Sequence, residues 1–401
     1  MRDVIGANIK RLRTQRSWSQ ADLARRVCLC AGVSGDPVGR QEISRYENGK
    51  RSPREWQPFI AQALGVTVDE LRTEYLPPDL APPSLADYLP SGDPLVALQA
   101  RNGRRIGSGV VDDLRQRVHG LRLADDVIAG GDLIRPALRE LRTAVKLYRD
   151  SVHTDDVGRE LLRQIGELAQ IAGWIASDAG QHAEAEHIYK LGISAARKAG
   201  DATLVGNLAG SLAYQYANNG READGLALAS AALDEAGTSA PPKARALYLD
   251  RLAWANAKIG PTNAQAAMAA LGEASTALAA EDSGTDSPAY LYWVSAGELQ
   301  IMESRVYTEL RRPLRAVPLL RDVLSRYNAT HVRELALYLS WLAVALADAN
   351  EPEEAAAVAA RVIEMSADVA SERTAERVHV VRERLEEYRD VPEVRAVLDA
   401  A

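Results

Sequence analysis

The apolar positions of the first 75 residues recur at the spacing of short helices. Ile5, Ile9 and Leu12 repeat every three to four residues, which places them on one face of a helix. Leu23 marks a second helix, for which Ser19 is a suitable N-cap. Three further stretches follow: Ile43 and Tyr46; Trp56, Phe59, Ile60 and Leu64 between Pro53 and Gly65; and Leu71 after Thr67. The pattern predicts five short helices, with Pro53 opening the fourth.

The third of these helices, within Gly39 to Pro53, carries side chains that suit DNA. Its polar positions at i, i+1, i+4 and i+5 are Arg40, Gln41, Ser44 and Arg45. Arginine and glutamine can each form two hydrogen bonds with a purine edge in the major groove. Beyond the Asn48-Gly49 stop signal, Lys50 and Arg51 can reach backbone phosphates. The alternative is a polar surface helix followed by a turn.

At these residues the chain resembles the Cro and phage-repressor type of helix-turn-helix, also called xenobiotic-response-element regulators. The resemblance covers about residues 3 to 75. It rests on motifs in their usual order: Ser19-Gln20, Leu23-Ala24, Ile43-Ser44, Glu47-Asn48-Gly49-Lys50 and Pro53. It implies a five-helix, lambda-repressor-like DNA-binding domain in residues 1–76.

The resemblance also implies a role for individual residues. Arg13 and Glu47 occupy the positions of a buried pair that joins the first helix to the third. One further residue would bind a phosphate from the start of the second helix, Gln20. The residues implied at base edges are Arg40, Gln41, Ser44 and Arg45, and those implied on the DNA backbone are Asn48, Lys50 and Arg51.

One segment departs from that family. Between Ala24 and Ile43 the chain has about nine residues more than the usual tight turn, and Cys28 to Gly39 is rich in turn-forming residues. Either the second helix is longer, or a flexible loop approaches the DNA backbone. The segment also holds both cysteines, Cys28 and Cys30. They suggest a redox or metal switch, or simply two small half-buried residues, since one pair lacks the other ligands of a structural zinc site.

After this domain the composition changes twice. Residues 77–94 contain six prolines, which predicts a semi-rigid linker. From residue 95 to 401 the chain is rich in Ala and Leu at helical spacing. A turn motif recurs in Gly180 to Ala185, in Gly220 to Gly225, forty residues later, and in Asn350 to Ala355.

These segments resemble tetratricopeptide repeats, which implies an all-α fold with an α-solenoid after the DNA-binding domain. We expect about five helix pairs between 159 and 370, preceded by a divergent helical segment at 95–155 and followed by capping helices. Such a stack curls and exposes a concave face.

Aromatic residues recur within this repeat pattern. Trp174, Tyr214 and Trp254 lie forty residues apart, each directly after a small residue: Gly173, Ala213 and Ala253. In a tetratricopeptide-like stack this position faces the groove, where three aromatics would suit a peptide or a flat organic ligand. Other groove-facing candidates are Gln170, Asn207, Asn218, Asp250, Arg251 and Arg305. The alternative is that the aromatics form core between repeats.

Charge separates the two regions. The net charge of −7 divides into +4 for residues 1–76, with 13 Lys and Arg against 9 Asp and Glu, and −11 for the remainder. A basic first region can dock on phosphates while the acidic region stays off the duplex. No run of eighteen apolar residues and no secretory segment occurs, so we expect a cytoplasmic protein without a membrane partner.

No catalytic motif, cofactor motif or metal motif is present in the sequence, so an enzyme is not expected. The sequence instead predicts a transcription regulator, a homodimer on an inverted-repeat operator, whose helical-repeat domain senses a peptide or small molecule. This combination resembles quorum-peptide receptors of Gram-positive bacteria and regulators found beside antibiotic gene clusters. Two alternatives remain: an adaptor whose repeats bind a protein partner, and a scaffold that only dimerises.

Overall fold

The computed structural model describes residues 2–33, 37–72, 104–128, 130–281, 287–327, 332–366 and 371–400. The chain divides into two compact units, Met1–Pro82 and Pro83–Ala401. The expected linker at 77–94 lies outside the described residues. All elements in the described ranges are helices, apart from an isolated bridge between Arg105 and Val152. The predicted all-α fold is therefore confirmed, and no helix within those ranges is long and apolar enough to cross a bilayer.

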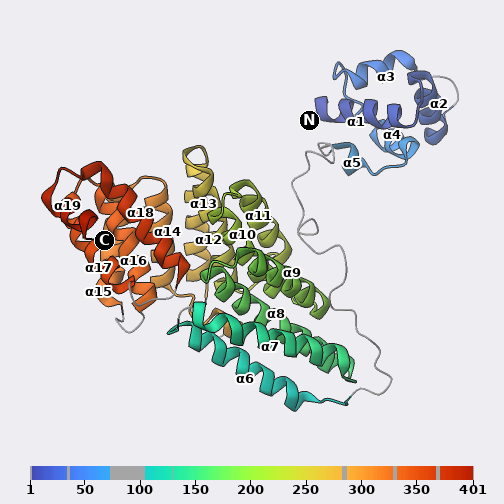
Figure 1. Ribbon diagram of the computed structural model, residues 1–401. Helices are drawn as coiled ribbons and strands as arrows, with labels where there is room; N and C mark the ends of the chain where they lie inside the picture. The colour runs from blue at the N-terminus through green and yellow to red at the C-terminus, as the bar shows by residue number, and fades with distance from the viewer. Residues whose placement is uncertain are drawn as a thin grey trace. The chain divides into compact units, whose positions relative to one another are not determined.

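The first unit contains the five predicted helices. They are α1 (Arg2–Gln15), α2 (Gln20–Ala31), α3 (Arg40–Glu47), α4 (Gln57–Leu64) and α5 (Val68–Arg72) (Figure 1). Ser19 caps α2 as expected: its hydroxyl accepts a hydrogen bond from the Asp22 amide, and Asp22 accepts one from the Ser19 amide. Thr67 and Glu70 form the same reciprocal pair at the start of α5. Local hydrogen bonds thus set both helix starts.

The expected start of the fourth helix was wrong. Residues 54–56 form a turn, and α4 begins at Gln57, four residues after Pro53. Pro58 explains the difference. A helix opening at Pro53 would place Pro58 in its interior, where the missing N–H removes a hydrogen bond; as the second residue of α4, Pro58 loses none.

The extra segment before α3 partly lengthens α2. The helix continues to Ala31 and ends at Gly32, whose φ of 64° is the left-handed conformation that glycine adopts without strain. The helix thus includes the first residues of this segment, while residues 34–36 lie outside the described ranges and the expected loop near the DNA backbone stays a prediction. Cys28 is buried in the core of the first unit, with its Sγ 3.7 Å from the carbonyl oxygen of Val38, and Cys30 is half-buried. No group of three metal-ligating side chains occurs within the described ranges.

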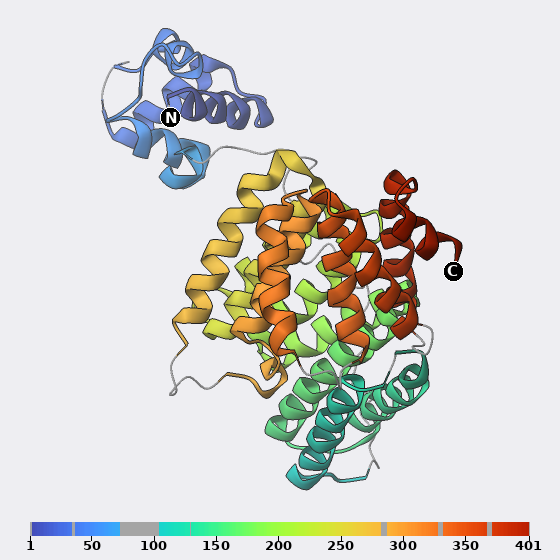
Figure 2. The same cartoon turned by 90° about the vertical axis from the view of Figure 1, so that its left-hand side faces the viewer.

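The second unit is a stack of helix pairs. It begins with α6 (Ser108–Asp125) and α7 (Gly130–Asp150) and ends with α18 (Glu372–Leu385) and α19 (Pro392–Asp399). Between them lie five pairs: α8 (Asp155–Asp178) with α9 (His182–Ala199), α10 (Ala202–Asn218) with α11 (Glu222–Ala236), α12 (Pro242–Ile259) with α13 (Ala264–Ala279), α14 (Ala296–Glu309) with α15 (Pro313–Arg326), and α16 (Val332–Asp348) with α17 (Pro352–Ser366). Successive pairs pack side by side (Figures 1 and 2). The tetratricopeptide assignment itself stays a prediction.

A left-handed residue closes the turn within each of these five pairs. The residues with positive φ at this position are Gly180, Gly220, Gly260, Arg311 and Asn350. The sequence motif identified three of them. Arg311 was not identified, because the conformation normally favours glycine or asparagine and leaves no sequence signal at an arginine.

Two glycine substitutions separate the effect of this conformation from that of added volume. A Cβ at Gly220 or at Gly272 would meet no atom within 4 Å, but only Gly220 has positive φ, whereas Gly272 lies within α13. We expect Gly220→Ala to destabilise the chain by about 1 kcal/mol. Gly272→Ala should stabilise it by roughly 0.5–1 kcal/mol, because alanine favours helix. Urea denaturation followed by circular dichroism measures both, and equal effects would contradict the assignment.

Candidate functional site

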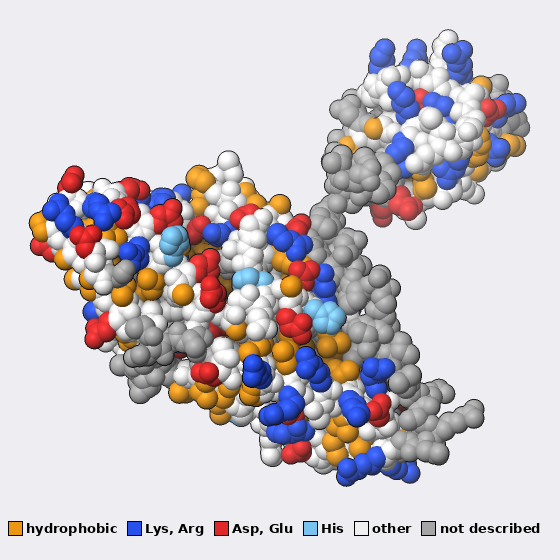
Figure 3. All heavy atoms as spheres, viewed as in Figure 1, with side chains coloured by type: hydrophobic (Ala, Val, Ile, Leu, Met, Phe, Trp, Pro, Cys, Tyr) orange, Lys and Arg blue, Asp and Glu red, His pale blue; other side chains and the backbone are white. Residues whose placement is uncertain are grey.

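Helix α3 presents the predicted DNA-contacting side chains on its solvent face. Arg40, Gln41 and Arg45 are exposed and Ser44 is half-buried, whereas Ile43 lies fully buried in the core. Figure 3 shows Lys and Arg side chains projecting where Figure 1 places α3. After the helix, three further residues predicted to contact DNA are exposed: Asn48, Lys50 and Arg51.

A buried polar cluster fixes α3 against the rest of the unit. Arg13 of α1 donates from Nε to Glu47 Oε1 at 2.6 Å and from Nη2 to Oε2 at 3.2 Å. Gln20 of α2 donates to the same Oε2 at 2.7 Å. The predicted Arg13–Glu47 pair is therefore present. The amide nitrogen of Gln20 is bound to Glu47, so this nitrogen would have to leave Glu47 to contact the phosphate that the resemblance implied.

Glu42 restrains two of the cations on this surface. Its carboxylate oxygens lie 2.6 Å from Arg45 Nη1 and 2.8 Å from Arg51 Nη1. Asn48 donates to the Ser44 carbonyl at 2.7 Å, which closes the end of α3. A base or phosphate that binds Arg45 or Arg51 therefore competes with an exposed ion pair, a contact of small net strength.

The second unit encloses a cavity of about 480 Å³. Five of the predicted ligand-contacting residues line it: Gln170, Trp174, Asn207, Arg251 and Arg305. They come from α8, α10, α12 and α14, the first helices of four successive pairs. The rest of the wall comes from further residues of α8, α10 and α14, from the end of α6, from α16 and α18, from residues 290–295 and from Tyr327 after α15. The cavity thus lies among helices from both ends of the stack.

Trp174, Tyr214 and Trp254 stack in a row as predicted. Together they form an aromatic ladder, in which each ring is one rung. The ring centroids of Trp174 and Tyr214 are 5.9 Å apart and those of Tyr214 and Trp254 are 6.1 Å apart. Trp341 meets Trp254 edge-on at 5.6 Å. The small residues before these rungs allow the helices to approach: a Cβ at Gly173 would lie 2.7 Å from the Tyr189 ring.

Only one of the three predicted aromatic residues lines the cavity. Trp174 lines the wall, but Tyr214 and Trp254 do not, and Trp254 is only 3% exposed. Guanidinium groups lie over their rings: Arg251 is 4.6 Å from the Tyr214 centroid and Arg305 is 4.9 Å from that of Trp254. For these two rungs the core alternative describes the structure better.

Two other predicted ligand contacts also lie outside the wall. Asn218 accepts a hydrogen bond from Trp254 Nε1 at 3.2 Å and donates to the Tyr214 carbonyl at 2.8 Å. Asp250 is buried, 3.6 Å from Arg251. Asn218 therefore positions the ladder, and Asp250 is a counter-charge behind it.

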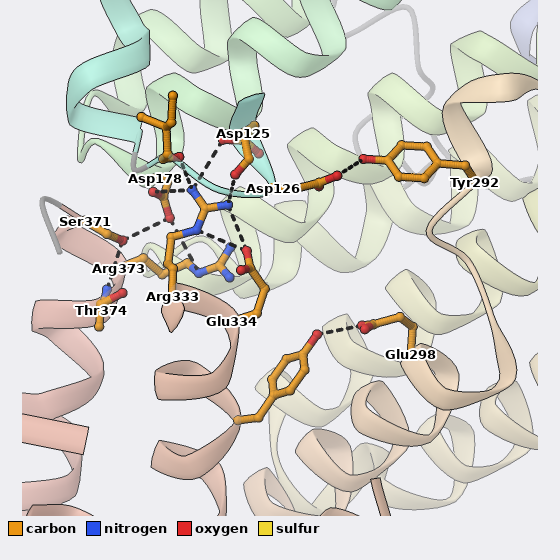
Figure 4. A network of polar contacts seen from close by, with 12 residues as sticks. Asp125, Asp126, Asp178, Tyr292, Glu298, Arg333, Glu334, Ser371, Arg373 and Thr374 are labelled. Atoms are coloured by element: carbon orange, nitrogen blue, oxygen red, sulfur yellow. Dashed lines mark hydrogen bonds and ion pairs between the residues drawn. The ribbon is translucent and has the colours of Figure 1, made fainter. Parts of the chain in front are cut away.

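A buried ion-pair network joins the two ends of the stack. Arg333, in the first turn of α16, donates to Asp125 of α6, to its carbonyl at 2.6 Å and its carboxylate at 3.3 Å. The same guanidinium lies 3.4 Å from Asp178 and 2.8 Å from Glu334 (Figure 4). Burial raises the pKa of Asp125 to about 6, although the charge of Arg333 opposes the shift.

Sequence reasoning missed much of the cavity wall. Arg333 and Arg373 reach it from late helices, and their positions leave no signal in the repeat pattern. A signal did exist for another part of the wall: Ala289 to Trp293 holds three aromatics in five residues of a chain with 5% aromatics. Tyr292 of this segment donates to Asp126 at 2.6 Å, as Figure 4 shows.

Comparison with known proteins identifies the first unit. Residues 4–73 match the family model described as a helix-turn-helix domain. The first unit is a helix-turn-helix domain. The exposed polar face of α3 lies within the matched residues.

The whole chain gives weaker comparisons. No curated protein matches it. Among solved structures it is similar to that of Bacillus thuringiensis PlcR in complex with the peptide PapR7 and DNA. The identity is 13%, the match covers 89% of this chain and 99% of PlcR, and the TM-score is 0.33. So low a score does not transfer the peptide or DNA to this chain.

The guanidinium groups around Tyr214 give a test of the site. Burial raises the pKa of Tyr214, but the charges of Arg305, Arg373 and Arg251 lower it further, to about 8. We expect one phenolate to appear near pH 8 in ultraviolet difference absorbance of the full chain and to be absent in Tyr214→Phe.

The lowered pKa of Tyr214 also makes the stability of the fold depend on pH. Because the folded pKa lies below the usual value of 10, the phenolate stabilises the fold fully above pH 10, and this contribution is lost as pH falls through 8. Tyr248, whose pKa burial raises, provides a control: Tyr248→Phe should leave the pH 8 step unchanged. A step that persists in Tyr214→Phe would contradict the assignment.

Proposed function

We propose that this protein is a sequence-specific transcription regulator that binds DNA through α3 and a signal molecule in the cavity of its second unit. The observation that carries the proposal is the exposed polar face of α3, held by the Arg13–Glu47–Gln20 cluster. In a helix-turn-helix domain the corresponding helix enters the major groove.

The exposed side chains divide by chemistry into two sets. The set proposed for base edges is Arg40, Gln41, Ser44 and Arg45, and the set proposed for the backbone is Gln20, Asn48, Lys50 and Arg51. Base contacts specify the sequence, whereas phosphate contacts supply position and salt-dependent affinity. A single unit with four base-reading residues covers a short site, so we propose a homodimer on an inverted repeat with half-sites about one helical turn apart.

The cavity is the proposed receptor site because its wall joins helices from both ends of the stack. A molecule that contacts α8, α14 and α18 at once would favour one arrangement of these helices over others. Such a preference is what an effector needs in order to alter DNA binding. The volume of about 480 Å³ suits a small molecule or a few residues of a peptide.

Substitutions on α3 test the DNA half of the proposal. We expect Arg45→Ala to weaken binding to a selected operator by about 1–3 kcal/mol and to relax one base position. Lys50→Ala should weaken all sequences alike and lower the salt slope by about 1, since it removes a phosphate contact. Fluorescence anisotropy with operator and random duplexes measures both. Equal losses on the two duplexes for both variants would contradict the division into base and phosphate contacts.

Filling the cavity tests the receptor half. Ser211 lines the cavity at 5% exposure, and its hydroxyl donates to the Asn207 carbonyl. We expect Ser211→Phe to abolish retention of small molecules from a cell extract, as detected by native mass spectrometry, because the ring occupies their volume. Operator binding without ligand should be unchanged.

The matched control is Thr276→Phe, on the exposed face of α13, where the hydroxyl makes the same kind of bond to Gly272. This variant should retain whatever the unaltered protein retains. Equal retention by Ser211→Phe would contradict the cavity as receptor site.

A further inference from the structure

The aromatic ladder ends in a cation. Trp174, Tyr214 and Trp254 each follow a small residue in the first helix of a pair, and in α14 the residue after buried Ser304 is Arg305. Its guanidinium lies 4.9 Å from the Trp254 centroid and donates to the Tyr214 hydroxyl. The fourth rung is therefore an arginine, and it lines the cavity.

The arginines of the cavity fall into two groups. Arg122 and Arg333 have close carboxylate partners, Arg122 with Glu167 at 3.0 Å and Arg333 with Glu334 at 2.8 Å. Their charges are balanced by carboxylates of the protein itself. These two arginines are part of the wall, but they need no charged group from a ligand.

The second group is poorly balanced. Arg251 has Asp250 at 3.6 Å, and Arg373 has Asp178 at 3.9 Å, a carboxylate that Arg333 shares. Within the described ranges no carboxylate lies within ion-pair distance of Arg305, on which Asp250 acts from farther away, and its buried Nε has no hydrogen-bond partner. Cations held away from water need a counter-charge or strong hydrogen bonds.

These three guanidinium groups lie close to the rings of Trp174 and Tyr214 in the ladder. Arg251 and Arg373 lie 5.9 Å and 5.2 Å from the Trp174 centroid, and Arg251 and Arg305 lie 4.6 Å and 5.3 Å from that of Tyr214. Each lines the cavity, as does Trp174. Their positive potential is also expressed in the lowered pKa of Tyr214.

We infer that the ligand of this cavity is an organic anion, whose charged group binds Arg251, Arg305 and Arg373 and whose apolar body lies against Trp174. The inference rests on the receptor role proposed for the cavity and specifies its chemistry. Arginine binds carboxylates through paired hydrogen bonds, which are stronger than neutral ones. Ile171, Ile301 and Met302 add apolar wall for the rest of the molecule.

Two dyes with the same aromatic body test the charge. 8-Anilinonaphthalene-1-sulfonate is an anion, and N-phenyl-1-naphthylamine lacks the sulfonate. We expect the full chain to bind the anion at least about tenfold more tightly, the effect of one charge-assisted contact. Arg305→Met should bring the ratio of the two affinities close to one, because it weakens binding of the anion more than binding of the neutral dye, and Arg305→Lys should keep part of the preference. Fluorescence titration measures all three.

Control variants separate charge from folding. Arg373→Met changes a less buried member of the group and should also reduce the preference. Arg321→Met, at an exposed arginine of α15, should not. Equal affinity for the two dyes, or an unchanged preference in Arg305→Met and Arg373→Met, would overturn the inference. The receptor role is judged separately by Ser211→Phe, so the two proposals can fail independently.

Competition distinguishes the source of the anion. Displacement of the bound anionic dye by an apolar tripeptide acid, with no displacement by its C-terminal amide, supports a peptide carboxylate. Displacement by 2-naphthoate and by neither peptide supports a small aromatic acid. Equal displacement by the acid and amide of either compound would overturn recognition of charge.

Discussion

The contact of Arg333 with Asp125 and Asp178 is the constraint on which the second unit depends. It connects α16 to α6 and α8, across 208 and 155 residues of sequence. Helices from the end of the chain therefore complete a cavity wall whose other side is formed by helices from the start of the unit. Buried ion pairs of this kind add little net stability, because desolvation offsets their attraction, but breaking one partner is costly. The network therefore fixes the register of the two ends, and the cavity exists where that register places them.

The ladder shows how one repeated position can serve two purposes. The small residue before each rung lets two helices approach, and the side chain after it points inward. In the middle of the stack that side chain is aromatic and packs against its neighbours. At α14 it is Arg305, whose guanidinium lies over the Trp254 ring and whose side chain also lines the cavity. The same position in successive helix pairs thus supplies both core packing and part of the cavity wall.

Features set by neighbouring residues were predictable from sequence. Ser19 and Thr67 cap their helices through residues three places on, and the turns at Gly180 and Gly220 follow from a local motif. The predicted start of α4 at Pro53 was wrong, because Pro58 is tolerated only in the first turn of the helix. The exposure of Tyr214 and Trp254 could not be predicted, since the arginines over their rings belong to other turns and other helices. The Arg333 network leaves no local trace at all.

The anchor of α3 has a consequence for how this protein diverges. Glu47 is bound by Arg13 and Gln20 on the buried side, whereas Arg40 and Gln41 point to solvent and take no part in that cluster. Substitutions at the exposed positions leave the core contacts of the unit intact. If α3 reads DNA as proposed, the sequence that it recognises can therefore change through a few surface residues while the contacts that hold the helix in place stay as they are.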